Sequence, residues 1–184
     1  MAGHGIDRFV ILSGCSGGGK SALLDELARR GHATVSEPGR RVVAEQLREG
    51  GTALPWVDTV GFLQRVLVLA QADHDAAHRA KGRVFFDRGV IDAVAGLYHL
   101  TGGPDPIAVA RRYRSHHRVF LVPPWPEIHV NDAERRHGMD EAIAEYDRLA
   151  ATYPALGYEV MVLPRVSVAE RADMVLAALA GDQP

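Results

Sequence analysis

The sequence predicts a three-layer α/β fold, in which helices cover both faces of a parallel β-sheet. Two observations support this prediction. Five short apolar runs alternate with long stretches in which apolar residues recur at helical spacing. A glycine-rich loop stands directly after the first apolar run and directly before the first helical stretch. Right-handed crossovers through helices would place those helices on both sides of the sheet.

The predicted strands are short and mostly apolar along their whole length. This pattern is typical of parallel strands that are buried on both faces, whereas a half-exposed strand would alternate apolar and polar residues. We expect the five strands at Phe9–Ser13, Ala33–Glu37, Arg83–Asp87, Arg118–Val122 and Glu159–Leu163.

The predicted helices fill the intervals between these strands. The longest is expected over Pro55–Ala80, where apolar residues from Trp56 to Ala70 share one face. Gly102, Gly103 and Pro104 separate two helices between the third and fourth strands. The other expected helices are Lys20–Arg30, Arg40–Glu49, Ile91–Leu100, Pro106–Ser115, Asp140–Tyr153 and Val168–Ala180.

The chain of 184 residues fits one domain of ordinary size, so we expect a single domain over residues 1–184. No linker divides it. The stretch Pro123–Gly138 is polar and begins with prolines, and it is the best candidate for a mobile lid.

Composition and charge argue against several classes of protein. The formal net charge is -2, which gives no global attraction to nucleic acid or acidic membranes. One cysteine cannot form an internal disulfide, and the start of the chain does not resemble a signal peptide. No apolar run approaches the roughly 20 residues of a membrane span. We therefore expect a cytoplasmic protein without a membrane span. Its oligomeric state, including a homodimer, stays open.

The glycine-rich loop matches the phosphate-binding pattern G-x-x-x-x-G-K-[ST]. Its glycines let successive backbone N–H groups point at phosphate oxygens, and the following helix N-terminus favours negative charge. The lysine would neutralise the β- and γ-phosphates, and the serine hydroxyl would ligate Mg²⁺. The sequence therefore predicts binding of ATP, with GTP as the alternative, together with Mg²⁺. The loop consists of Gly14, Cys15, Ser16, Gly17, Gly18, Gly19, Lys20 and Ser21.

Cys15 lies inside this loop and has two interpretations. The simpler one is a small residue that fits the turn. The other is a thiol whose pKa is lowered by the helix N-terminus, which would make it an oxidation-sensitive switch.

Two carboxylates are expected at the edge of the sheet that faces the ligand, where parallel strands end. Asp87 ends the third predicted strand and is placed to hold Mg²⁺ opposite Ser21; alternatively, it caps the next helix. Glu37 ends the second predicted strand and could accept the proton of an attacking hydroxyl or orient it. Arg40, close behind, points either into this site or to solvent.

Arg88 follows Asp87, where motor-type ATPases usually carry a glutamate that activates water. An arginine there suits phosphoryl transfer or the binding of an acceptor, unless it only forms a salt bridge. Arg135 and Arg136 lie in the predicted lid. They are expected either to close over the transferring phosphate or to belong to a solvated helix.

Two other signals carry less weight. His74 and His78 are four residues apart on a predicted helix, but no third metal ligand is evident, so we expect a surface helix face. The basic run from Arg111 to Arg118 is expected to be solvated and not to bind nucleic acid.

Several motifs together resemble the small bacterial AAA-type ATPase family, which is related to the nicotinamide riboside kinase domain and to nucleoside and nucleotide kinases. They are the phosphate loop, Ser36-Glu37-Pro38, Phe86-Asp87-Arg88-Gly89 and Leu163-Pro164-Arg165-Val166-Ser167. The resemblance implies a five-stranded sheet of order 2-3-1-4-5 and an acceptor-site carboxylate at Glu37. It also implies a lid with Arg135 and Arg136, and a loop at Pro164, Arg165 and Val166 that borders the adenine.

The sequence thus favours a small-molecule kinase that transfers the γ-phosphate of Mg-ATP to a hydroxyl of a nucleoside-like acceptor. Lys20, Glu37, Asp87 and Arg88, with the lid arginines, are the candidate catalytic residues. The alternatives are a nucleotide-dependent switch or slow ATPase with a protein or lipid partner, and a nucleotide-binding protein without turnover.

Overall fold

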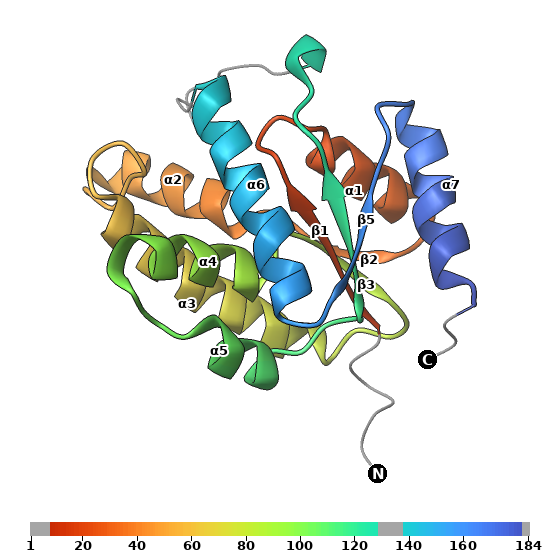
Figure 1. The fold of residues 1–184 in the computed structure, drawn as a ribbon, viewed down its shortest axis with the longest axis horizontal. Helices are drawn as coiled ribbons and strands as arrows, with labels where there is room; N and C mark the ends of the chain where they lie inside the picture. The colour runs from red at the N-terminus through yellow and green to blue at the C-terminus, as the bar shows by residue number, and fades with distance from the viewer. Residues whose placement is uncertain (1–7, 129–137, 182–184) are drawn as a thin grey trace.

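The computed structural model describes residues 8–128 and 138–181. Five parallel strands form one sheet in the order β2-β3-β1-β4-β5 (Figure 1). The strands are β1 (Phe9–Gly14), β2 (Ala33–Val35), β3 (Val84–Asp87), β4 (Arg118–Val122) and β5 (Glu159–Val162). This confirms the predicted fold class, the parallel sheet and the strand order that the family resemblance implied.

Helices cover both faces of this sheet (Figure 1). They are α1 (Lys20–Arg29), α2 (Pro38–Glu49), α3 (Thr59–Ala77), α4 (Val90–Thr101), α5 (Pro106–Arg112), α6 (Met139–Ala155) and α7 (Val168–Leu179), with a short 3₁₀ turn η1 (Pro126–Ile128). On one face, Val10 and Leu12 of β1 pack against α1 and α7. On the other, Phe9 and Ile11 pack against α3, α4 and α6. Alternate residues of the buried central strand therefore serve two separate cores.

The sheet register aligns the strand ends that matter for the candidate site. Leu12 lies beside Asp87 of β3 on one side and Phe120 of β4 on the other. Gly14, the first residue of the phosphate loop, lies beside Val122 at the end of β4. The loop, Asp87 and the segment after β4 consequently share one edge of the sheet.

Several predicted boundaries were wrong by two to four residues; among them, α3 ends at Ala77 and not at Ala80, and α5 ends at Arg112 and not at Ser115. Those nearest the site have a local cause. The long helix begins at Thr59 and not at Pro55, because the Asp58 side chain caps it by accepting from the Gly61 N–H at 2.9 Å. The second strand ends at Val35, and α2 begins at Pro38, whose fixed φ suits the first helical position. Glu37 is therefore the N-cap residue of α2 and not the last residue of a strand. Across the described ranges, no helix is long and apolar enough to cross a membrane.

Candidate active site

The phosphate loop is fitted tightly against the end of β4. Gly14 has φ 107°, and a Cβ there would lie 2.4 Å from the Val122 carbonyl oxygen. The Cys15 N–H donates to the same oxygen at 2.9 Å. Gly19 adopts φ 84° as the N-cap of α1. A side chain at Gly14 would require the loop to move away from β4, so glycine is needed there for close approach as well as for its φ.

Lys20 and Cys15 are both buried within this loop. The Lys20 Nζ donates to the Cys15 carbonyl oxygen at 2.7 Å, and 5% of Lys20 is exposed. The Cys15 thiol is fully buried, and burial raises its pKa above the ordinary value. The hypothesis of a thiol with a lowered pKa was therefore wrong, because desolvation outweighs the charge of Lys20. Its full burial favours the simpler interpretation, that Cys15 is a small residue that fits the turn.

Ser21 at the start of α1 and Asp87 at the end of β3 are in direct contact. The Ser21 hydroxyl donates to Asp87 Oδ2 at 3.0 Å, while Asp87 Oδ1 is buried and has no hydrogen-bond partner among the described residues. Burial raises the pKa of Asp87 to about 6, against the opposing charge of Lys20. A hydroxyl and an unsatisfied carboxylate oxygen are ligands that Mg²⁺ prefers, so this pair fits the ion.

The predicted alternative, in which Asp87 caps the following helix, is not what the structure has. Asp92 serves this purpose instead, since its Oδ2 accepts from the Gly89 N–H at 2.9 Å in the first turn of α4. Asp92 Oδ1 also accepts from the Ser13 hydroxyl at 2.5 Å, and Oδ2 accepts from the Tyr153 hydroxyl at 2.6 Å. Asp92 thus ties β1, α4 and α6 together. Sequence analysis did not single it out, although an acid three residues after Gly89 fits a capping box.

Arg88 lies among three carboxylates. Its Nε donates to Glu37 Oε1 at 3.1 Å, its Nη2 to Glu145 Oε2 at 2.8 Å, and its Nη1 is 3.5 Å from Asp92 Oδ1. Its φ of 67° is uncommon for a residue other than glycine, and it turns the side chain into the site. Burial opposes its charge, but the carboxylates outweigh burial and raise its pKa well above the ordinary value. Arg88 is therefore cationic and held in one place.

Glu37 is held by arginines on two sides. Besides Arg88, the Nε of Arg40 lies 3.4 Å from Glu37 Oε2. Burial alone would raise the pKa of Glu37, but the positive charges of Arg88, Lys20 and Arg40 outweigh it and lower the pKa. Glu37 is consequently ionised, and Arg40 points towards the site and not away from it.

A pocket of about 260 Å³ opens from the phosphate loop and runs between α3, α4 and α6. Ser16 of the phosphate loop lines it, together with the apolar side chains Phe62 and Leu63 and the carboxylate of Asp92. Glu141, Glu145 and Arg148 line it from α6. Arg88, which contacts both Asp92 and Glu145, joins this pocket to Glu37. The site thus has a phosphate side and a separate polar pocket beside it.

A family model described as an AAA domain matches residues 9–171 of the 184. The chain belongs to this AAA domain family of P-loop NTPases. No curated protein sequence matches it.

Three solved structures that resemble this AAA domain protein are kinases by name. Shikimate kinase from Acinetobacter baumannii, solved with shikimate, is 15% identical, with 96% of this chain and 94% of that chain covered and a TM-score of 0.64. Deoxyadenosine kinase from M. mycoides, solved with dCMP and dCDP, is 12% identical, with 94% of this chain and 99% of that chain covered and a TM-score of 0.66. Shikimate kinase from Aquifex aeolicus is 14% identical, with 95% and 97% covered and a TM-score of 0.58. At these identities the likeness shows a kinase-like P-loop fold.

The predicted adenine loop of this AAA domain protein is linked to the phosphate loop through Arg171, a residue that sequence analysis missed. Arg171 Nε donates to the Pro164 carbonyl and Nη1 to the Gly18 carbonyl, both at 2.8 Å. Its guanidinium lies 4.6 Å from the centre of the Trp125 ring, and only 1% of the residue is exposed. Arg165 donates to the Pro124 carbonyl at 2.5 Å. The segment from Pro164 to Val166 is thus fastened to both the loop and the segment after β4; its role towards adenine stays a prediction.

Arg135 and Arg136 lie outside the described residues, as does most of the predicted lid. The structure describes residues 123–128 of that stretch, which end in the turn η1, and Gly138 at the start of α6.

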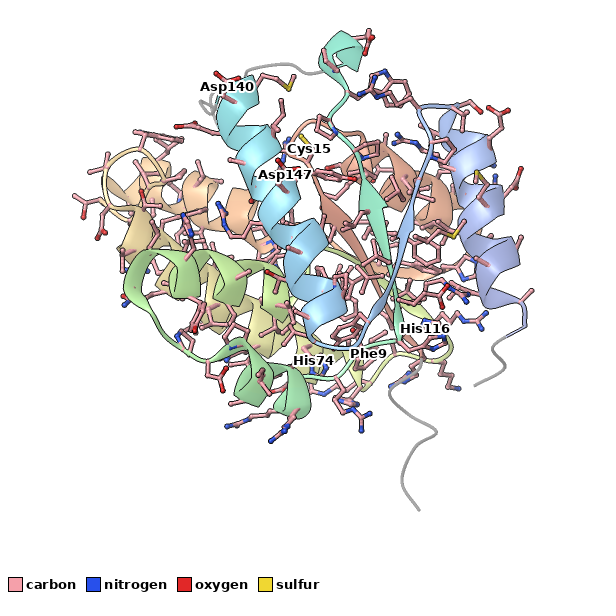
Figure 2. The ribbon with its side chains drawn as sticks, in the orientation of Figure 1. Phe9, Cys15, His74, His116, Asp140 and Asp147 are labelled. Carbon is pink, nitrogen blue, oxygen red and sulfur yellow. The ribbon has the colours of Figure 1, made fainter. Side chains whose placement is uncertain are left out.

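His74 and His78 do not form a metal centre. Both rings contact Phe9 edge-on, and His74 Nε2 lies 3.0 Å from the Arg114 carbonyl oxygen. Figure 2 shows His74 and Phe9 together at the end of the sheet opposite Cys15. Nowhere in residues 8–128 and 138–181 do three or more acidic, histidine or cysteine side chains gather as a metal site. Both histidines pack this end of the sheet, whereas a surface helix face was expected; the His74 side chain in particular is mostly buried, because Phe9 of β1 packs against it.

Proposed function

We propose that this AAA domain protein is a kinase that transfers the γ-phosphate of Mg-ATP to a hydroxyl of a small, nucleoside-like molecule. One observation carries the proposal: the pocket of about 260 Å³ begins at Ser16 of the phosphate loop and is joined through Arg88 to Glu37. A pure hydrolase needs room for one water beside the γ-phosphate. A pocket of this size, with apolar walls and several polar groups, is what a second substrate needs.

On the nucleotide side, the backbone of Gly14–Gly19 would surround the phosphates and Lys20 would neutralise them. Ser21 and Asp87 would hold Mg²⁺, which supplies charge neutralisation and orientation of the phosphates when bound. The segment from Pro164 to Val166 would border the adenine.

On the acceptor side, Glu37 is proposed to orient the hydroxyl by accepting a hydrogen bond from it. A carboxylate with a lowered pKa is a weak base, so this favours orientation over full proton abstraction. Arg88 already satisfies three carboxylates, and we assign it the positioning of Glu37. Charge on the transferring group would then fall to Lys20 and to the lid arginines, Arg135 and Arg136. Catalysis would consist mainly of positioning and electrostatics, as in other phosphoryl transfers.

The charge of the pocket favours an acceptor without negative charge. Asp92, Glu141 and Glu145 contribute carboxylates to the pocket lining, against the single cation Arg148. Arg88 offsets part of this charge, and Glu37 adds to it. In a partly desolvated pocket a further anion would be repelled. We therefore expect uncharged or cationic hydroxyl compounds to be accepted in preference to their anionic counterparts, such as a nucleoside in preference to its monophosphate.

The residue after Asp87 argues against the alternative of a slow ATPase or switch with a protein or lipid partner. Arg88 stands there, and it carries no group that could activate a water. The two functions are distinguished by ADP release from Mg-ATP, measured without acceptor and with nucleosides, their monophosphates, nicotinamide riboside and hydroxylated antibiotics. A kinase gives a large acceptor-dependent rise that Lys20→Ala abolishes. A slow rate that no acceptor changes would favour the switch.

A further inference from the structure

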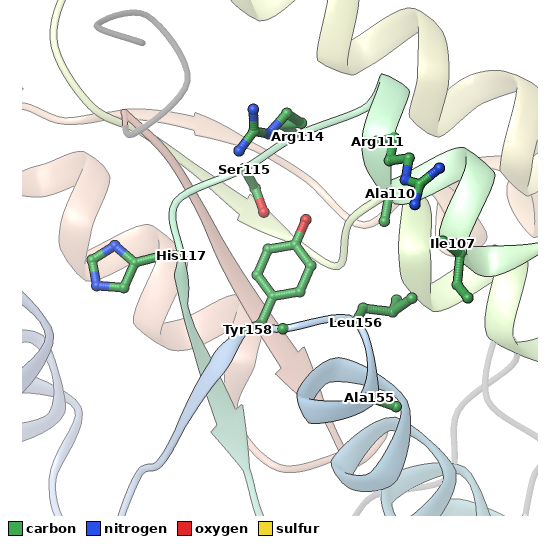
Figure 3. A pocket seen from close by; sticks show the side chains of 10 residues that line it. Ile107, Ala110, Arg111, Arg114, Ser115, His117, Ala155, Leu156 and Tyr158 are labelled. Atoms are coloured by element: carbon green, nitrogen blue, oxygen red, sulfur yellow. The ribbon is translucent and has the colours of Figure 1, made fainter.

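A second cavity, of about 720 Å³, opens at the edge of the sheet opposite the phosphate loop (Figure 3). Its walls come from α5, from the segment that leads into β4, and from the turn between α6 and β5. The phosphate loop follows the other end of the six-residue strand β1. At 3.3 Å per residue the two sites are separated by about 20 Å of sheet. The cavity is therefore no part of the candidate active site.

The cavity is lined by cations and by no carboxylate. Arg111 and Arg114 contribute guanidinium groups, and His117 lies at its margin. Within residues 8–128 and 138–181, neither guanidinium has a hydrogen-bond or ion-pair partner. Arg118, at the start of β4, differs in this respect because it is paired with Glu159 at 3.0 Å. The Arg112 guanidinium lies outside the cavity, over the Tyr113 ring. Two unpaired arginines facing one hollow form a site for an anion.

The rest of the lining is suited to an organic molecule more than to a bare inorganic ion. Ile107, Ala110 and Leu156 form an apolar side. The Tyr158 ring also lines the cavity, with its hydroxyl directed towards the side formed by Ser115 and Arg111 (Figure 3). An aromatic face, an apolar wall and two donors would hold the ring of a ligand while the arginines hold its charged group.

We propose that this cavity is a second ligand site, which binds a small organic anion with a carboxylate or phosphate group on an apolar or aromatic body. The cavity also adjoins the active-site scaffold. The Tyr158 ring contacts the Tyr153 ring edge-on at 5.5 Å, and the Tyr153 hydroxyl donates to Asp92. The proposal does not depend on the function proposed above, because it concerns binding at residues that take no part in it.

The test is a titration of the full chain, labelled with ¹⁵N, with benzoate, phenyl phosphate and, as the uncharged control, benzamide. We expect benzoate or phenyl phosphate, or both, to shift the amide signals of Ser115, His117, Gly157 and Tyr158, and benzamide to leave them unchanged. The two anions distinguish a carboxylate site from a phosphate site. Phenyl phosphate would also be expected to bind at the phosphate loop, so its effect is measured in Lys20→Ala as well, where shifts around the cavity should persist.

Substitutions test whether Arg111 and Arg114 bind the anion. Arg111→Gln with Arg114→Gln should weaken binding about ten-fold or more, because both charge-assisted contacts are lost. Arg65→Gln with Arg112→Gln removes the same charge from exposed positions outside the cavity and should leave binding within about two-fold. All variants are checked for an unchanged melting temperature. The absence of shifts around the cavity with either anion, or equal weakening by both arginine pairs, would overturn the proposal.

Discussion

Glu37 Oε1 accepts from Arg88 Nε at 3.1 Å, across the ends of two neighbouring strands. Arg88 in turn contacts Glu145 on α6, so the pair connects the N-terminus of α2 with the wall of the pocket. The ionised state of Glu37 and its fixed position both follow from this contact. Most of what we expect of the acceptor side depends on it.

Replacing Glu37 should separate catalysis from nucleotide binding. Glu37→Gln keeps the shape of the side chain but removes the charge that orients the hydroxyl. We expect turnover with acceptor to fall about 100-fold, in the range usual for a lost acid–base or orienting group, while ATP affinity changes little. Glu45→Gln, on an exposed turn of the same helix, is the matched control and should be fully active. Full activity of Glu37→Gln would remove Glu37 from the mechanism.

Asp87 should lower the stability of the nucleotide-free protein at neutral pH. Its pKa of about 6 lies above the ordinary 3.8, so its charge opposes folding fully above pH 6, and this penalty is lost as the pH falls from 6 to 3.8. Asp87→Asn should therefore raise the free energy of unfolding at pH 7 by up to about 3 kcal/mol, at 1.36 kcal/mol per pKa unit. Denaturant melts of both proteins, without Mg²⁺, should show this gap narrowing as the pH falls from 7 to 4. A difference in the free energy of unfolding that does not depend on pH would contradict a raised pKa for Asp87.

The same substitution should harm function while it helps stability. Asp87→Asn removes half of the proposed Mg²⁺ pair, so we expect the Mg²⁺ concentration needed for half-maximal activity to rise about ten-fold or more. Steady-state rates over a Mg²⁺ titration would measure this. An unchanged Mg²⁺ requirement would exclude Asp87 as a ligand.

Arg171 should be important for both stability and nucleotide affinity. Arg171→Met keeps much of the apolar stem but leaves the carbonyls of Gly18 and Pro164 without their charged donor. We expect a loss of about 2 kcal/mol of stability, the usual cost for hydrogen bonds to a charged group, and a weaker Kd for ATP. Arg165→Met, whose side chain is exposed and does not reach the phosphate loop, should have the smaller effect. Thermal unfolding and ATP titration of both variants test this; equal effects would mean that Arg171 does not organise the loop.

Tyr153 should stabilise the protein through Asp92. Tyr153→Phe removes the hydroxyl that donates to Asp92 Oδ2 at 2.6 Å in a buried position. The expected loss is about 1–3 kcal/mol, since Asp92 Oδ2 would lose one of its hydrogen-bond donors in a buried position. Tyr146→Phe, on the same helix but without this contact, is the control. Chemical denaturation would measure both, and equal stabilities would contradict the role given to Asp92.

The features that the sequence predicted correctly are those that depend on residues close together in the chain. Continuous apolar runs revealed the five strands, although β2 and β5, at the two edges of the sheet, are only partly buried and not buried as predicted. The glycines before Lys20 and Ser21 revealed the phosphate loop, because their spacing directly reflects backbone geometry. Asp87 and Glu37 could be placed because parallel strand ends share one edge of a sheet. The helix starts at Thr59 and Pro38 were missed by a few residues, since capping by Asp58 and by proline was not weighed.

The contacts that were missed join residues far apart in the chain. Arg171 reaches Gly18 across 153 positions and Tyr153 reaches Asp92 across 61, and no spacing in one sequence encodes such pairs. The contact between Glu145, which lines the pocket, and Arg88 also joins distant residues and could not be predicted in this way. The prediction of a lowered pKa for the Cys15 thiol failed for a related reason. Its pKa is set mainly by burial, and burial cannot be predicted from the position of the residue before a helix N-terminus.

The central claim is that the γ-phosphate goes to an acceptor hydroxyl and not to water. The direct measurement uses ATP labelled at the γ-phosphate, with the acceptor that most increases ADP release, and follows the label into products by chromatography and mass spectrometry. The proposed function predicts a phosphorylated acceptor formed in equal amount to ADP, lost in Lys20→Ala and strongly reduced in Glu37→Gln. Label found only as inorganic phosphate, at a rate that no acceptor changes, would contradict the kinase and leave the nucleotide-dependent switch as the better account.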